Sequence, residues 1–239
     1  MFFILPTLIV IAVYILAAVL PAFYLMRRVQ RLDTIEKEPP GLLLILTLLG
    51  VAAALVSIVL EGVGEKLLSV FLDRTSPAYT LILAFLVVAA VEEGTKFFFL
   101  RLRTWRDPNF DYRFDGVVYA VFVSLGFAAF ENISYVSGYG LSVAVPRAIL
   151  AIPGHMGFAV FMGVFYGRAK QCENRGDQRG KNLNLFLGYL IAVLLHGFYD
   201  ACAMIGSVLS TVLFVLFVML MYFIVIRLIR RESRTDEPT

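Results

Sequence analysis

Seven ionisable side chains lie within stretches of this sequence that are apolar enough to cross a membrane. A charge at the centre of a lipid bilayer costs roughly 2.5–3.5 kcal/mol, so such residues usually face a polar cavity and take part in function. Carboxylates and imidazoles in that setting can move protons, bind metal ions or form an ion path. The seven are Glu92, Glu93, Lys96, Glu131, His155, His196 and Asp200.

The spacing of these residues predicts particular pairs. Glu92 and Lys96 are four residues apart, so they can pair on one face of a helix. Glu93 points about 100° away and needs another partner or a bound proton. His196 and Asp200 are also one helical turn apart, a spacing at which a carboxylate can orient an imidazole and fix its tautomer.

These residues are predicted to lie at similar depths in the membrane. Counting from the expected outer helix ends, Glu131 lies about 8 Å deep, His155 about 12 Å, His196 about 14 Å and Glu92 about 18 Å. Pro153 and Gly154 should open the helix backbone beside His155. Four helices would thus deliver polar groups to one depth, as a shared water-filled site requires.

Taken one at a time, the same residues have structural explanations. Glu92 with Lys96 could be a buried ion pair, and His155 could cap the backbone opened by Pro153. His196 with Asp200 could be a clamp between helices. Asn132, Ser134 and Tyr135 could mark the membrane interface. Their common depth favours a functional site over these separate explanations.

The residue types suit amide hydrolysis, which needs a base for water, a donor for the oxyanion and an acid for the leaving amine. The sequence contains neither GxSxG nor HExxH. Two histidines and a carboxylate would nevertheless suffice to bind catalytic zinc, with a second glutamate as base. Zinc is therefore possible but not required, and the candidate ligands are Glu131, His155 and His196.

The composition predicts an all-α integral membrane protein with a single domain over residues 1–239. Hydrophobic residues make up 60% of the chain and charged residues only 16%, far from the ~45–50% and ~25% of soluble domains. The formal net charge is +3, and no basic run of the kind that binds nucleic acid is present. Partners are therefore expected in the membrane, and nucleic acid is not. The two cysteines, Cys172 and Cys202, form no CxxC pattern.

Hydropathy predicts about seven membrane-spanning helices, since a span needs about 20 mostly apolar residues. The boundary between the last two is the least defined, and a bent or re-entrant segment is the alternative there. The first segment lacks the basic start of a secretory signal, so we expect it to be retained. The predicted spans are 2–26, 41–60, 80–100, 116–136, 147–167, 185–205 and 208–226.

Loop charges predict the orientation. Most of the 21 Lys and Arg residues follow the first, third, fifth and seventh spans, which places the N-terminus outside and the C-terminus in the cytoplasm. Residues 61–79 would then lie outside, and their mixed stretch 65–73 would be either an interfacial amphipathic helix or a plain loop. The glycines Gly163 and Gly167 predict a close contact between helices.

Four motifs on successive helices resemble those of the PrsW intramembrane proteases. Glu92-Glu-Gly-Thr-Lys96 resembles the EExxK motif, and Asp115-Gly-Val-Val-Tyr119 with Gly126-Phe-Ala-Ala-Phe-Glu-Asn132 resembles the second block. Pro153-Gly-His155 and His196-Gly-Phe-Tyr-Asp200 match the last two. The resemblance covers roughly residues 80–205.

The resemblance implies a site-1 protease in the bacterial inner (plasma) membrane that cuts a single-pass anti-sigma factor on its extracytoplasmic side. The family is also similar to the CAAX prenyl endopeptidases, for which metal involvement has been argued both ways. Carried over, Glu92 or Glu93 would be the general base, while Glu131, His155 and His196 would polarise water or substrate. Asp200 would orient His196.

Two other functional classes remain open at this point. A proton or metal-ion transporter could use the same Glu, His and Asp residues. Paired halves with matching broken helices are common in transporters, whereas this sequence has a single Pro-Gly break and no duplicated half. A scaffold or sensor that has kept polar clamps is the third reading.

Overall fold

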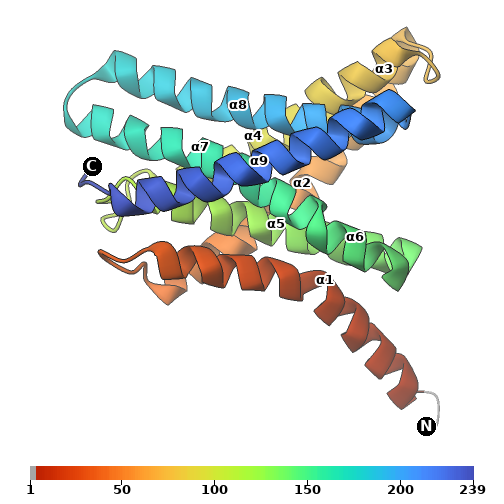
Figure 1. Cartoon of the computed structure of the whole chain (residues 1–239), viewed down its shortest axis with the longest axis horizontal. Coiled ribbons are helices and arrows are strands. Elements are labelled where there is room, and N and C mark those ends of the chain that lie inside the picture. The colour runs from red at the N-terminus through yellow and green to blue at the C-terminus, as the bar shows by residue number, and fades with distance from the viewer. Residues whose placement is uncertain (1–3) are drawn as a thin grey trace.

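The computed structural model describes residues 4–239 as a bundle of helices (Figure 1). Within this range the only β-type pairing is a single bridge between Tyr112 and Pro238, which confirms the all-α prediction. The elements are α1 (Ile4–Leu32), α2 (Pro40–Phe71), α3 (Pro77–Ile82), the π-helical η1 (Leu83–Ala89), α4 (Ala90–Thr104), α5 (Asp115–Tyr139), the 3-10 turn η2 (Leu141–Val143), α6 (Ala144–Ile149), α7 (Ala151–Asn174), α8 (Gln178–Ile205) and α9 (Val208–Arg234).

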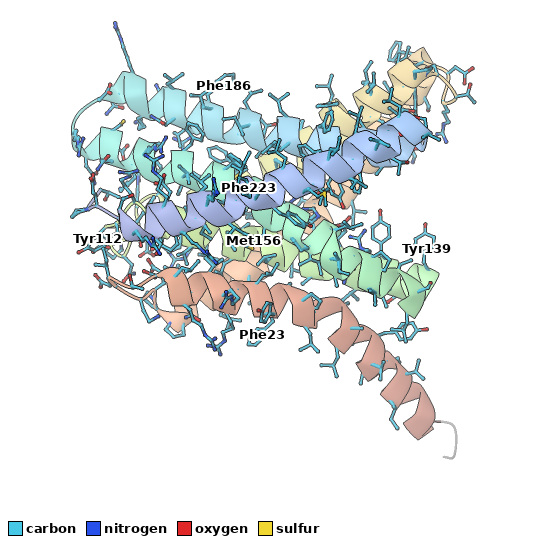
Figure 2. All side chains as sticks on the ribbon, viewed as in Figure 1. Phe23, Tyr112, Tyr139, Met156, Phe186 and Phe223 are labelled. Carbon is cyan, nitrogen blue, oxygen red and sulfur yellow. The ribbon has the colours of Figure 1, made fainter. Side chains whose placement is uncertain are left out.

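Six helical stretches are long and apolar enough to cross a membrane, and they correspond to six of the seven predicted spans. The remaining predicted span, 80–100, falls on the run α3–η1–α4, which the π-helical turns divide and which carries Glu92, Glu93 and Lys96. Large apolar side chains such as Phe23, Phe186 and Phe223 project from the outer helices (Figure 2) and are about half exposed. A surface of this kind is suited to lipid rather than water.

Two uncertain boundaries are resolved. The segment 61–79 is not a separate interfacial helix, because α2 continues without a break to Phe71, and the connecting loop is confined to residues 72–76 before α3. The last two spans are separate helices: Gly206, in the left-handed conformation at φ +63°, ends α8, and the Ser207 hydroxyl accepts a hydrogen bond from the Ser210 N–H at the start of α9.

The helix α5 forms the centre of the bundle and is buried along most of its length. It approaches α7 closely because glycines line the contact: a Cβ at Gly163 would lie 2.5 Å from the Cα of Val117, and one at Gly167 would lie 2.2 Å from the Arg113 carbonyl oxygen. The predicted contact at Gly163 and Gly167 is therefore present. Gly126 allows an equally close approach between α5 and α2.

The outermost helix is α1, whose N-terminal half turns away from the bundle in Figure 1. Pro21 lies inside this helix, and a proline removes one backbone hydrogen bond and favours a kink. The C-terminal half of α1 packs on α5 through Ala22, Met26 and Val29. The predicted site residues lie on the four helices α4, α5, α7 and α8.

Candidate active site

A cavity of about 570 Å³ opens where α2, α4, α5, α6, α7 and α8 meet. Five of the seven predicted residues line it: Glu92, Glu131, His155, His196 and Asp200. The other two, Glu93 and Lys96, are buried beside it. A larger cavity of about 680 Å³ lies at the end of α4, but its lining contains three arginines and no imidazole. The smaller cavity is therefore the candidate active site, because carboxylates and imidazoles line it.

Lys96 holds the cluster together. Its Nζ donates to Glu92 Oε2 at 3.0 Å, to Glu93 Oε1 at 2.8 Å and towards His155 Nδ1 at 3.2 Å. It also lies 3.8 Å from the ring centre of Phe127, a cation–π contact. The expected pairing of Glu92 with Lys96 is present. Glu93, expected to need a different partner, shares Lys96 and has a second partner in His196.

The hydrogen bonds of His155 fix its tautomer. Because the Lys96 ammonium is a donor only, Nδ1 of His155 accepts and Nε2 carries the proton. That proton is donated to Glu131 Oε2 at 2.9 Å. The Ser124 hydroxyl donates to the His155 carbonyl oxygen at 3.0 Å and holds the backbone beside Pro153. Both ring nitrogens of His155 are thus engaged within the protein.

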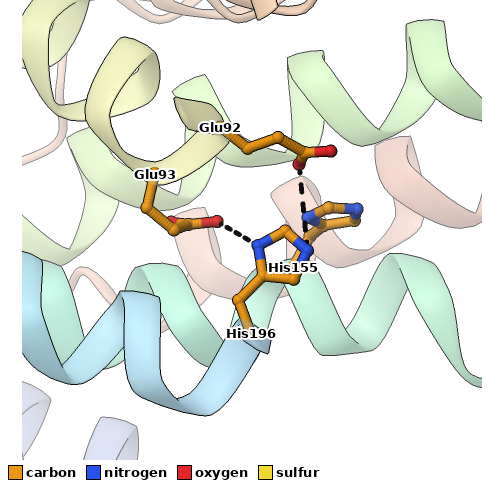
Figure 3. Close-up of side chains that lie close together, drawn as sticks. All are labelled: Glu92, Glu93, His155 and His196. Atoms are coloured by element: carbon orange, nitrogen blue, oxygen red, sulfur yellow. Dashed lines mark hydrogen bonds and ion pairs between the residues drawn. The ribbon is translucent and has the colours of Figure 1, made fainter. Parts of the chain in front are cut away.

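His196 lies between carboxylates on both sides of its ring. Its Nδ1 is 2.9 Å from Glu93 Oε1, and its Nε2 is 3.3 Å from Asp200 Oδ2 and 3.9 Å from Glu92 Oε2. The predicted contact between His196 and Asp200 is therefore present. Phe158 stacks on the ring at a centroid distance of 4.8 Å and restricts its rotation. Figure 3 shows Glu92 and Glu93 reaching from one helix towards the two imidazoles.

Two local features of the backbone set these positions. The π-helical turns of η1 directly precede Glu92, and π-helical segments occur often at functional sites. Gly197 adjoins His196, and a Cβ there would lie 2.3 Å from the Phe85 ring. The absence of a side chain at Gly197 therefore lets α8 approach η1 and brings His196 within reach of Glu93.

The sequence did not assign three further polar residues, which lie in or beside the cavity, to the site. Arg147 lies 2.9 Å from Glu131 Oε2, donates to Asn132 Oδ1 at 2.8 Å and stacks over Tyr135 at 3.7 Å. Asn132, considered an interface marker, is fully buried and also donates to the Ala18 carbonyl oxygen. Glu61 lines the cavity from α2. The sequence does contain a signal for Glu61, because this acidic residue stands at the end of a long apolar run.

The site offers donors of the types that bind zinc, but their arrangement does not leave them free. One ligand atom each from Glu92, Glu93, His155 and His196 lies within 4.8 Å of the others. However, the Lys96 ammonium lies among them and donates to three of the four. Glu131, a predicted ligand, is outside this set and bonds to the far nitrogen of His155. As arranged, these residues do not fit a bound zinc ion.

Comparison with known proteins gives a consistent result. A family model described as "PrsW family intramembrane metalloprotease" matches residues 38–227. A Protease PrsW of Clostridioides difficile is 31% identical over 211 residues, which cover 87% of this chain and 86% of the relative. The Protease PrsW of Geobacillus kaustophilus is 33% identical over 186 residues, covering 77% and 76% of the two chains. That of Bacillus subtilis is 30% identical over 184 residues, covering 77% and 79%.

No solved structure matches the chain. The family model spans every residue of the carboxylate–imidazole cluster described above, from Glu92 to Asp200. The chain is a multi-pass membrane hydrolase, and it belongs to the PrsW family of intramembrane metalloproteases.

Proposed function

We propose that this protease hydrolyses a peptide bond of a single-pass membrane protein with a water molecule activated by Glu92. The observation that carries the proposal is the position of Glu92. Its carboxylate lines the cavity, while Lys96 holds one of its oxygens at 3.0 Å and His196 lies 3.9 Å from the same oxygen. Glu93 does not line the cavity and is fully buried, so Glu92 is the better placed base.

The proposed reaction needs only protein groups and water. Glu92 takes a proton from water, and the oxygen of that water forms a bond to the carbonyl carbon of the substrate. The carbonyl oxygen becomes an oxyanion, which accepts a hydrogen bond from His196 Nε2. The C–N bond then breaks, and the proton held by Glu92 passes to the leaving amine.

The remaining residues position these groups. Asp200 and Glu93 face the two nitrogens of His196, so each can accept a hydrogen bond when both nitrogens carry protons. Lys96 contributes a fixed positive charge beside Glu92, a role that a metal ion would otherwise fill. Glu131, oriented by Arg147, holds His155 and so completes the polar wall of the cavity.

The substrate class follows from the membrane setting and from the family resemblance of the motifs. A polar cavity within the bundle suits a substrate that is itself in the membrane, and we propose an anti-sigma factor cut at its first site. Membership of a protease family removes the reason to consider an ion transporter.

The test is cleavage of a single-pass reporter by the purified protein in liposomes. We expect the Glu92→Gln and His196→Ala variants each to lose activity by about 10²–10⁴-fold while remaining folded in the membrane. Glu65→Gln is the matched control, since Glu65 lies one turn beyond Glu61 on α2 and pairs with the exposed Arg74. Cleavage at the parental rate by both site variants would refute the mechanism.

A further inference from the structure

Glu61 is the one carboxylate of the cavity that the described part of the chain leaves without a partner. Four carboxylates line the cavity: Glu61, Glu92, Glu131 and Asp200. Glu92 pairs with Lys96, Glu131 with His155 and Arg147, and Asp200 with His196. Within residues 4–239 Glu61 takes part in no ion pair, and its Oε1 is buried without a hydrogen-bond partner.

This carboxylate is held at the wall of the cavity by the packing of α2. Gly64, one turn further along the helix, lies so close to η1 that a Cβ there would be 2.8 Å from a methyl group of Val87. The neighbouring Val59, Leu60 and Val63 are about half or more exposed on the lipid side. Glu61 is therefore on the inner face of α2, and its contacts must come from whatever enters the cavity.

An unpaired carboxylate in a poorly hydrated site is costly unless a positive charge or a hydrogen-bond donor reaches it. The cations in or beside the cavity are already engaged: Arg147 by Glu131 and Asn132, and Lys96 by Glu92 and Glu93. Glu61 lies about 30 Å along α2 from Pro40, close to the length needed to cross the hydrocarbon core. At this end of the hydrocarbon core, a long basic side chain of a bound molecule can keep its charged head group near water.

We propose that Glu61 is a specificity residue that binds a lysine or arginine of the substrate beside the scissile bond. This inference rests on the proposed function and adds the chemical class that the cavity selects. The cation would approach Oε1 of Glu61, while the adjoining backbone of the substrate reaches Glu92 and His196 in the same cavity. A substrate lacking the basic side chain would be bound more weakly but cut by the same groups.

Binding and cleavage are measured separately to test this. Binding of single-pass reporters in nanodiscs is measured with the Glu92→Gln protein, expected to be inactive, using reporters that carry either Lys or Met at successive positions around the cut. We expect one position at which Lys binds about tenfold tighter than Met. Adding Glu61→Gln should abolish that difference and leave Met binding unchanged, whereas Glu65→Gln should alter neither.

Charge reversal gives a second measurement. With otherwise active protein, Glu61→Lys should cut a reporter with Glu at that position better than one with Lys, mainly through KM. A preference for Lys that persists in Glu61→Gln, or equal binding of all reporters to the parent, would overturn the inference. A parent that binds Lys reporters selectively but cuts none of them would instead overturn the proposed function.

Discussion

At the scale of single residues, the site is organised by one buried ammonium group. Lys96 is 2% exposed and contacts Glu92, Glu93 and His155 at once. Breaking a buried ion pair by removing one partner costs about 3–5 kcal/mol, because the other charge is left without compensation. Lys96→Met should therefore lower the unfolding temperature and the folded yield, measured by thermal unfolding in detergent. Lys66→Met, at an exposed lysine of α2, should behave as the parent does.

The same geometry makes a prediction about metal. Since the ammonium group already satisfies three of the four candidate ligands, activity should survive treatment with a strong chelator and should not rise on addition of zinc. Cooperative ligands act together, so a required zinc would be lost whenever one ligand is removed. Elemental analysis showing one zinc per active chain, absent from His155→Ala and Glu131→Ala, would contradict this prediction.

Sequence alone predicted residue pairs that lie within one helix and missed those that form between helices. The contacts of Lys96 with Glu92 and of His196 with Asp200 follow from a spacing of four residues. The contact between Glu93 and His196 spans 103 positions and depends on Gly197 fitting against Phe85. No local pattern encodes that contact. Arg147 stands at the start of the predicted span 147–167, and no local pattern indicates its partner Glu131, which belongs to another helix.

At the scale of the helices, the distance between α5 and α7 sets the distance between Glu131 and His155. Gly163→Ala would place a Cβ 2.6 Å from the Gly116 carbonyl oxygen, so the helices must separate. Overpacking of this kind costs about 1–3 kcal/mol, and we expect lower thermal stability together with reduced cleavage. Gly138→Ala is the control, because Gly138 lies in α5 and has nothing within 4 Å of the added methyl group.

The connection between α1 and α2 makes stability depend on pH. Burial raises the pKa of Asp33 from 3.8 to about 6 and that of Glu38 from 4.5 to about 7. In the unfolded chain both ionise near their usual values, so the folded state binds more protons between about pH 4 and 7. Their contribution to stability is complete at low pH and is lost as the pH rises through 6 and 7.

Thermal unfolding between pH 5 and pH 8 measures this effect. The parent should unfold at a lower temperature at pH 8 than at pH 5, and Glu38→Gln should reduce that difference because the amide does not ionise. Glu36→Gln, at an exposed neighbour, should change the parental pH dependence less than Glu38→Gln does. A pH dependence unchanged by Glu38→Gln would show that this carboxyl group does not contribute to it.

Hydropathy predicted where helices exist better than where they end. Six spans fall on helical stretches of spanning length, one of them divided at Leu150 between α6 and α7, but the window 80–100 gave no sign of the π-helical turns at 83–89, which leave the apolar composition unchanged. Glu61 looked like the start of an external segment because an acid ends the apolar run. In the structure the backbone stays helical to Phe71, because the polar side chain has a cavity to face.

At the scale of the whole molecule, the predicted orientation decides where the substrate is cut. The basic loops predict that the start of α1 and the connection between α5 and α7 lie outside the membrane, and the cavity is lined by Arg147 and Tyr135 from that same end. A peptide bond can be hydrolysed only where its helix is unwound, and irregular backbone at membrane depth is tolerated only in a polar cavity. The cut should therefore lie outside the spanning helix of the substrate or within its first outer turns.

Mass spectrometry of both products from a single-pass reporter locates the cut, and cysteine labelling at Gly138 and at Arg175 reports the orientation of the protease itself. We expect label from the outside to reach position 138 but not 175, and the membrane product to keep a short outer tail. If the label pattern holds but the cut falls in the cytoplasmic half of the substrate helix, the assignment of the catalytic groups to this cavity is wrong. If the label pattern is reversed, the orientation is wrong, and the cut should then map to the cytoplasmic side.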